Sequence, residues 1–220
     1  MSTHQRENDR ENMDRTEIIT VPDANDTCTP NTNICRVSAS VIEKLETEKL
    51  NKEGEELLTA NKVIDFNKLR AKNPGWKPDL RCVDLRQAQL MHVNLIDANL
   101  ENAMLIGCDL SDARLDRANL KRANLFSSKL TLAILRGANL EEANLKRAVL
   151  TETNFENANL HRAILALVQA SFANFAKTNL TETDFTDATL NNSDFADAII
   201  TSSTNFRNVN LASVKNLKRA

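Results

Sequence analysis

The chain has 220 residues and a formal net charge of −2, a balance that favours neither a nucleic-acid binder nor a strongly acidic mimic of nucleic acid. Its four cysteines show no Cys-x-x-Cys spacing, and no apolar run approaches the roughly 18 residues that a membrane helix needs. The first twenty residues are polar and contain no apolar leader. We therefore expect a cytoplasmic protein with no membrane partner.

Residues 1–37 are rich in Asn, Asp, Thr, Glu and Arg and have almost no apolar period. Such a segment cannot offset the entropy cost of ordering by burying apolar surface, so we expect a disordered tail. Cys28 and Cys35 lie in this tail, and a disulfide between them would require an oxidising compartment.

Residues 38–76 change character, because the apolar positions between Val41 and Leu69 fit an amphipathic helix. We expect this helix to be interrupted near Gly54 and to stop at Asn73-Pro74-Gly75, since the residue before a proline avoids the helical region. The segment 38–76, ending in Trp76, is predicted to be a helical cap over the region that follows.

A five-residue period dominates the rest of the chain. From Leu80 to Ile200, 25 positions stay in phase and hold 19 Leu, 4 Phe, Ile200 and Ala170, and a small residue, Ala in 15 cases, stands two residues before each. A five-residue step smears leucines around an α-helix and alternates them across a strand. A chain that turns a corner once per unit instead points every leucine at a common axis and stacks its coils about 4.8 Å apart. The period therefore predicts a solenoid.

The units Ala98-Asn99-Leu100, Ala118-Asn119-Leu120 and Ala143-Asn144-Leu145 resemble those of the pentapeptide-repeat proteins. The resemblance covers residues 78–211 and implies a β-solenoid, specifically a right-handed quadrilateral parallel β-helix with four repeats per coil. The repeat domain is then residues 77–220. The phase slips by one residue between Ile200 and Phe206, and residues 212–220 are interpreted as a closing segment.

Four repeats per coil would stack residues twenty apart, so the outer faces can be assigned. We expect an amide ladder from Asn99 to Asn179 and an internal stack of Phe155, Phe175 and Phe195. Charge is uneven along the axis: residues 113–147 carry a net +5 and residues 148–197 a net −5.

Apolar residues on adjacent outer faces are the candidate binding surface, because a contiguous exposed apolar set marks an interaction site whereas single residues do not. The alternative is that the helix of residues 55–72 folds back and covers them. The partner-binding candidates are Met104, Ile106, Phe126, Leu132, Ile134, Val149, Ile164, Leu167 and Phe172.

The sequence contains no nucleotide-binding loop, no His-Glu-x-x-His and no Cys/His metal spacing, and His92 and His161 fall on different faces. We expect no catalysis, no cofactor, no small-molecule substrate and no nucleic-acid partner. The predicted function is a scaffold or interaction module that binds a protein partner or a second copy of the chain. One alternative is a DNA mimic that interacts with gyrase, like the quinolone-resistance pentapeptide proteins, although residues 77–220 hold 17 basic and 16 acidic residues. The other is an effector delivered into another cell, with the tail as its address.

Overall fold

The computed structural model describes residues 39–218. The predicted disordered tail, with Cys28 and Cys35, lies outside the described residues. The chain divides into two compact units, Met1–Leu45 and Glu46–Ala220, and the described part of the first unit is the start of helix α1. The remainder of the helical segment and all of the coils belong to the second unit.

Two helices precede the coils: α1 spans Ala39–Thr59 and α2 spans Val63–Lys72. The break lies at residues 60–62, where Asn61 has a φ of 56°, so the predicted interruption near Gly54 is wrong. Gly54 is buried inside α1, and a Cβ added to it would lie 2.7 Å from Cη2 of Trp76. The glycine therefore serves close packing against the indole. The predicted stop is confirmed, because α2 ends immediately before Asn73-Pro74.

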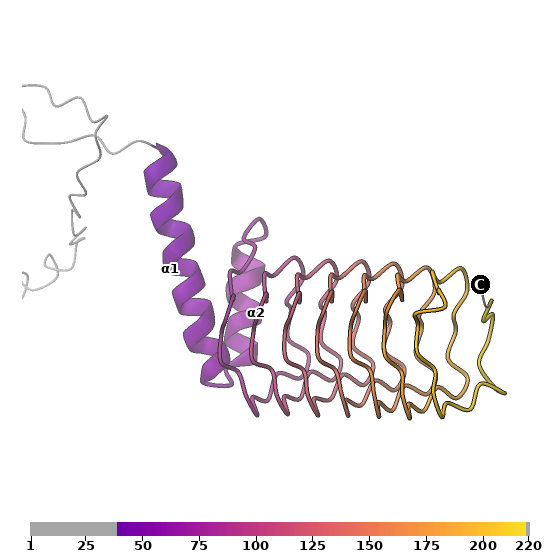
Figure 1. The fold of residues 1–220 in the computed structure, drawn as a ribbon. Helices are drawn as coiled ribbons and strands as arrows, with labels where there is room; N and C mark the ends of the chain where they lie inside the picture. Colours follow the sequence, from indigo (N-terminus) through magenta and orange to yellow (C-terminus); the bar gives the residue numbers. More distant parts are fainter. Residues whose placement is uncertain (1–38, 219–220) are drawn as a thin grey trace, which may run out of the picture. The chain divides into compact units, whose positions relative to one another are not determined.

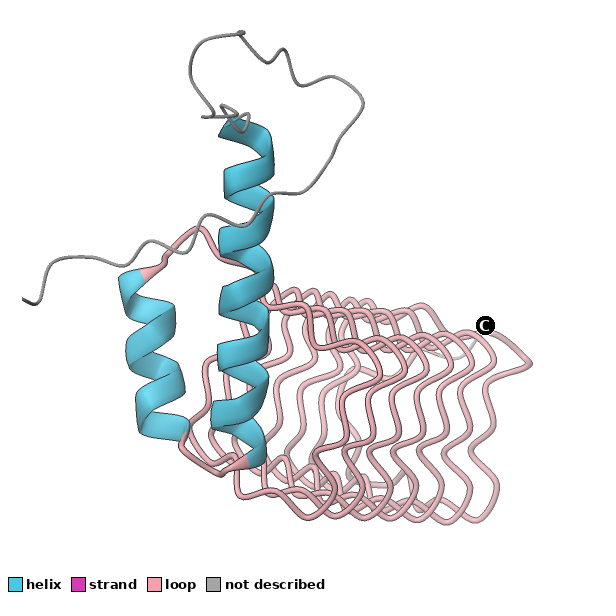
Figure 2. Ribbon diagram, turned by 90° about the vertical axis from the view of Figure 1, so that its left-hand side faces the viewer, coloured by secondary structure: helices cyan, strands magenta, loops and turns pink. Residues whose placement is uncertain are grey.

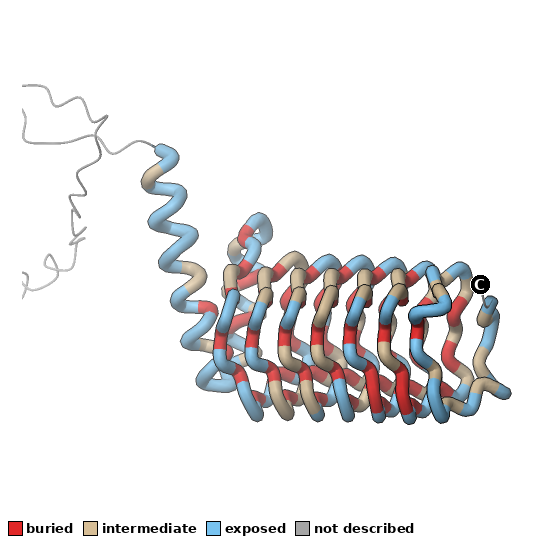
Figure 3. Tube along the Cα trace, viewed as in Figure 1, coloured by how far each residue is buried: buried red, intermediate tan, exposed pale blue. Residues whose placement is uncertain are grey.

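The described residues after α2 form a stack of coils (Figure 1). Parallel bridges join residues twenty apart, beginning with Asp79 to Asn99, and four such bridges and four turns make up each coil. Every in-phase position from Leu80 to Phe195 is buried, and Figure 3 shows these buried segments recurring on each coil. The predicted solenoid and its register are therefore confirmed.

The pairing between coils is sparser than that of a conventional parallel sheet. Within residues 39–218 the structure has isolated parallel bridges and no extended strands. Asn99 shows the pattern: its amide donates to the carbonyl of Pro78 (2.8 Å), and its carbonyl accepts from the amide of Leu80 (2.7 Å). Because the chain turns every five residues, each side is too short to hold a longer ladder.

Each corner is a four-residue turn, as where the amide of Val83 donates to the carbonyl of Leu80 (3.3 Å). The third residue of the turn has positive φ at every corner from Cys82 to Asp197, yet glycine fills this position only at Gly107 and Gly137. No Val, Ile or Thr occurs there among the described residues, because β-branched side chains tolerate the left-handed region worst. The position therefore has a steric rule of its own.

The parts of the solenoid are numbered in chain order. The first coil is residues 78–97, so the third, fourth and fifth are residues 118–137, 138–157 and 158–177. Side one of the first coil is centred on Leu80, and the other three sides follow at intervals of five residues. Each corner takes the number of the side that precedes it.

Helix α2 lies at the N-terminal end of the coils (Figure 2). The helical segment provides the first coil with hydrogen-bond acceptors that a preceding coil would otherwise provide. In later coils the amide of the bridge residue donates to a carbonyl one coil earlier. In the first coil three of these amides donate instead to asparagine side chains of the helical segment. The pairs are Asp79 to Asn51 (3.1 Å), Gln89 to Asn61 (2.7 Å) and Asn94 to Asn67 (2.8 Å).

Arg70 of α2 strengthens the same junction. Its side chain is buried and donates to the backbone carbonyls of Trp76 and Ile96, the latter at 2.7 Å. Phe66 packs against Trp76 with ring centroids 5.8 Å apart and belongs to the same core as the coil leucines. Helix α2 therefore makes both polar and apolar contacts at the start of the first coil.

Aromatic rings fill the core of the last coils. Phe155 and Phe175 stack with centroids 5.2 Å apart, and Phe195 follows at 5.0 Å, which confirms the predicted aromatic stack. The phase slip is absorbed by one extra residue, since Phe206 stacks on Phe185 at 5.2 Å. The segment interpreted as closing still pairs with the preceding coil, because Lys215 bridges Asp194.

Candidate protein-interaction surface

The inward positions hold no reactive group. Polar residues in the small slot bond to backbone carbonyls, as Thr153 Oγ1 does to Leu130 (2.7 Å). Cys108 is buried and donates its Sγ hydrogen to the carbonyl of Leu85 (2.6 Å). Burial raises the pKa of this thiol to about 11, so it stays protonated at neutral pH. Any function must therefore lie on the outside.

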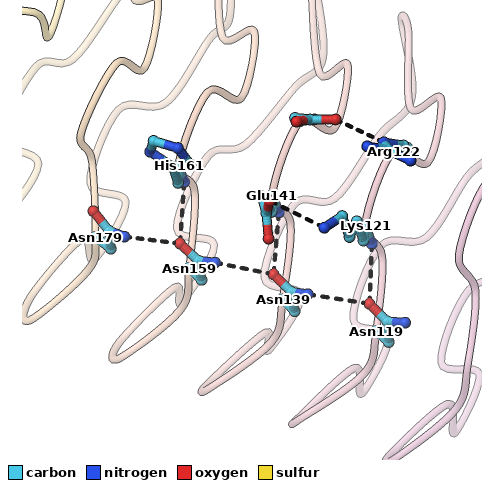
Figure 4. Close-up of polar contacts among 9 residues, drawn as sticks. Asn119, Lys121, Arg122, Asn139, Glu141, Asn159, His161 and Asn179 are labelled. Carbon is cyan, nitrogen blue, oxygen red and sulfur yellow. Dashed lines mark hydrogen bonds and ion pairs between the residues drawn. The ribbon is translucent and has the colours of Figure 1, made fainter.

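Side one is a closed ladder of asparagine amides (Figure 4). Asn119 donates to Asn99 (3.0 Å), and the chain of bonds continues to Asn179, which donates to Asn159 (3.0 Å). Each Oδ1 from Asn99 to Asn179 also accepts the backbone amide two residues further on, as in Lys121 to Asn119 (3.2 Å). The predicted ladder is confirmed, and its amides are occupied by the fold.

Corner one is neutralised by ion pairs between successive coils. Arg122 Nε lies 2.6 Å from Glu142 Oε2, and Lys121 Nζ lies 3.0 Å from Glu141 Oε1. The hydrogen bond from Arg122 lowers the pKa of the Glu142 carboxyl. Exposed pairs of this kind are weak, because solvent and salt screen the attraction between their charges. They cancel charge more than they add stability.

Five of the nine predicted apolar residues border side three in the third to fifth coils. Val149 lies on the side itself, while the others occupy its two flanking corners. Phe126 and Leu167 are at corner two, and Leu132 and Phe172 are at corner three. We call these five residues the side-three apolar set. Lys129 and Gln169 neighbour Val149 on the same side, which makes the surface mixed rather than continuously apolar.

The other four candidates lie outside that set. Met104 and Ile106 belong to the second coil, beside Phe126, while Ile164 lies on side two of the fifth coil and Ile134 on side four. On side two, Asn124 and Asn144 separate Met104 from Ile164 and are hydrogen-bonded to each other (3.4 Å). The structure therefore divides the predicted surface, and its binding role stays a prediction.

Three members of the side-three apolar set combine exposure with backbone strain. Leu132, Leu167 and Phe172 are 47%, 40% and 56% exposed and have φ of 60°, 62° and 61°. The left-handed conformation costs a non-glycine residue about 1–2 kcal/mol, and leaving a large apolar side chain in water forgoes its burial. Neither property helps the fold.

The helices do not cover this surface. The hydrogen bonds from α2 to the coils reach only the first coil, at His92, Asn94 and Ile96. The exposures of Leu132, Leu167 and Phe172 hold with the helices in place. The alternative in which residues 55–72 shield the apolar residues therefore does not describe this structure.

Two basic residues at corner two escaped the sequence analysis, which counted charge along the axis only. Lys146 and Arg147 are exposed and have no ion-pair partner among residues 39–218. The residues stacked on them from the adjacent coils are Phe126, Ser127, Ala166 and Leu167, none of which is a carboxylate. Reading the sequence in steps of twenty would have revealed this.

The described region offers little else that resembles a site. Between residues 39 and 218 no three potential metal ligands cluster, and no helix in that range is long and apolar enough to cross a membrane. His92 lies at corner three and His161 at corner one, so the two histidines are on different faces as predicted. A shallow hollow beside Cys82 is lined by charged residues that include the Asp79–Arg81 ion pair.

The structure is that of a repeat protein built from five-residue units. Every fifth residue from Leu80 to Phe195 is buried, parallel bridges join residues twenty apart, and a ladder of asparagine amides runs along side one. Two sequence models match the chain, one described as a pentapeptide repeat region over residues 138–215 and one as pentapeptide repeats over residues 94–131. The chain belongs to the pentapeptide-repeat family. No curated protein matches it.

Solved structures of pentapeptide-repeat proteins are similar over part of their length. A protein from Nostoc is 30% identical over 59% of this chain and 84% of its own, with a TM-score of 0.32. One from the Arabidopsis thaliana thylakoid lumen is 30% identical over 52% and 68%, also with 0.32. QnrB1, a plasmid-mediated fluoroquinolone resistance protein, is 16% identical over 66% and 78%, with 0.38.

Proposed function

We propose that this chain is a non-enzymatic scaffold or interaction module that binds another protein through the apolar outer residues of its coils. The observation that carries the proposal is the strained exposure of Leu132, Leu167 and Phe172. Asn or Gly at these turn positions would relieve the backbone and remove exposed apolar surface. Their presence is explained if a partner covers them.

The remaining parts of the chain have supporting roles in this proposal. Residues 38–76 act as a cap, because Asn51, Asn61 and Asn67 satisfy amides at the first coil. Residues 77–220 form the binding rod, a right-handed parallel β-helix in the sense that the family resemblance implies. Cytoplasmic location belongs to the same proposal.

The partner is a different protein or a second copy of this chain, and one experiment separates the two. Light scattering of the full chain, at rising concentration, reports self-association; affinity capture from the source cell reports a heterologous partner. We expect one of these to succeed with the intact chain and to fail with the triple variant Leu132→Asn, Leu167→Asn, Phe172→Asn. A triple variant that keeps the full complex would refute the proposal.

The net charge of −5 over residues 148–197 favours the DNA-mimic alternative, but the coils as a whole do not. A mimic needs rows of uncompensated carboxylates, whereas Glu141, Glu142 and Glu182 each pair with a base on a neighbouring coil. We expect no inhibition of gyrase supercoiling at a stoichiometric ratio. Potent inhibition would reverse the ranking of the two functions.

A further inference from the structure

Resting on the proposed function, the chemistry of corner two and side three narrows the kind of partner. We infer that side three binds an acidic amphipathic α-helix laid along the solenoid axis, whose apolar stripe contacts the side-three apolar set and whose carboxylates pair with Lys146 and Arg147. This step adds a charge requirement and a partner geometry that the proposed function does not contain.

The expectation of an acidic partner comes from the ion pairs that other basic residues of the coils form. Arg117, Arg122, Arg136 and Arg162 each pair with a carboxylate twenty residues away, on an adjacent coil. The corresponding neighbours of Arg147 are Ser127 and Leu167, so the fold offers it no counter-charge. A partner carboxylate would complete at corner two the pairing that the chain itself completes at corners one and four.

The apolar and basic residues alternate along the axis. Phe126 belongs to the third coil, Lys146 and Arg147 to the fourth and Leu167 to the fifth, and backbone bonds hold these corners in one column. Those bonds run from Ser127 to the carbonyl of Lys146 (3.0 Å) and from Arg147 to the carbonyl of Ala166 (3.0 Å). The surface therefore presents an apolar, a cationic and an apolar band, each about 4.8 Å from the next.

An α-helix matches that repeat. Its side chains at i, i+4 and i+7 lie on one face, and seven residues at 1.5 Å each span about 10.5 Å, against about 9.6 Å for two coil spacings. A side of about three extended residues is roughly 10 Å wide, close to the diameter of a helix. A helix along side three would therefore contact the apolar residues at corner two and at corner three, and it would lie over Val149.

Other anionic partners fit less well. Polybasic segments that hold an anionic membrane have about 4–8 cationic residues, and nucleic-acid sites neutralise several phosphates at once. In the third to fifth coils, corner two has two unpartnered bases, Lys146 and Arg147, while Lys129 on side three lies 3.6 Å from Asp109. Two positive charges beside apolar residues match a short segment of protein that is both acidic and apolar.

The test is a selection with a displayed library of 18-residue helical peptides, randomised on one face, against the intact full chain. We expect enriched peptides to carry Asp or Glu midway between two apolar positions seven residues apart. Synthesised peptides should lose at least about tenfold in affinity for Arg147→Glu and for Lys146→Glu. The matched control is Arg114→Glu, which reverses another exposed, unpaired arginine on side four and should leave affinity unchanged.

Several results would overturn the inference. They are failure to enrich any binder, enrichment without acidic residues, equal binding to Arg147→Glu with unchanged thermal melting, or Arg147-dependent binding of anionic vesicles or duplex DNA instead of peptide. The triple Asn variant distinguishes the two proposals. If peptide affinity falls for the triple Asn variant but not for Arg147→Glu, the proposed function stands and the acidic partner is refuted. If peptide affinity is unchanged for both variants, the proposed function and the acidic partner are both refuted.

Discussion

Side one and side three are built on the same backbone and differ in what their outer residues do. In the fourth coil the bridge position is Asn139 on side one and Val149 on side three. Asn139 donates to one neighbour and accepts from the next, while Val149 lies half-buried between Lys129 and Gln169 on the adjacent coils. Because the inward Leu and Ala residues alone set the coil geometry, the outer positions of one side can stabilise the rod while those of another remain available for binding.

Overpacking of the interior should break both sides at once and produce the largest effect. Ala143 is fully buried in the small inward slot, and Ala143→Leu forces extra volume into a close-packed axis. We expect a loss of about 1–3 kcal/mol or more. Denaturant unfolding measures it, with the outward substitution Thr151→Leu as control. Equal losses for the inward and outward variants would contradict the register.

A matched pair of truncations sharpens the contrast between the sides. Asn139→Ala removes two ladder bonds and the acceptor for the amide of Glu141, so we expect a loss of about 1–3 kcal/mol. Val149→Ala, at the same position of the same coil, removes two methyl groups from a half-exposed site and should cost less than about 1 kcal/mol. The comparison fails if Val149→Ala is the more damaging change.

The strain at the third turn position is tested where nothing else depends on the side chain. Glu152 has a φ of 57°, is exposed and has no ion pair within the described range. Glu152→Gly should stabilise or leave stability unchanged within about 1 kcal/mol, whereas Glu152→Val should cost about 1–2 kcal/mol. Thermal melts of the two variants check the order. A stable Val variant would remove strain from the case for Leu132, Leu167 and Phe172.

The ion pairs of corner one should have the smallest effect. Hydrogen bonds from Arg122 and Arg162 hold the pKa values of Glu142 and Glu182 below the ordinary 4.5. Their stabilising contribution is therefore present above pH 4.5 and is lost as the pH falls through the lowered values. The double variant Glu142→Gln, Glu182→Gln should melt slightly below the parent at pH 7 and together with it at low pH. A difference in melting temperature that grows as the pH falls would contradict this linkage.

The interior was predictable from sequence because one constraint acts on every unit. Each in-phase residue from Leu80 onward faces the same axis, so the five-residue period predicts a solenoid. Four repeats per coil then predict that residues twenty apart, such as Asn99 and Asn119, lie on adjacent coils. The absence of continuous strands was not predicted, since the five-residue period gives the corner spacing but not how many residues of each side pair.

The ends and the outer surface were less predictable, because they depend on contacts that do not repeat. Gly54 reads as a helix break until Trp76, 22 residues away, is placed against it. Asn51 looks like an ordinary surface residue, and its role at Asp79 arises only from packing. The outward direction of Leu132 and Phe172 was evident from their phase, whereas their separation from Met104 required the coils to be assembled.

The central claim is that Leu132, Leu167 and Phe172 serve binding and not folding. The most direct measurement is the free energy of unfolding of the triple variant Leu132→Asn, Leu167→Asn, Phe172→Asn by denaturant titration of the isolated full chain, below any concentration at which it self-associates. The account predicts no loss, or a small gain, because Asn tolerates the left-handed conformation and removes exposed apolar surface. A loss approaching the 1.5–3 kcal/mol per residue expected for buried side chains would show that these three residues are part of the core, and would contradict it.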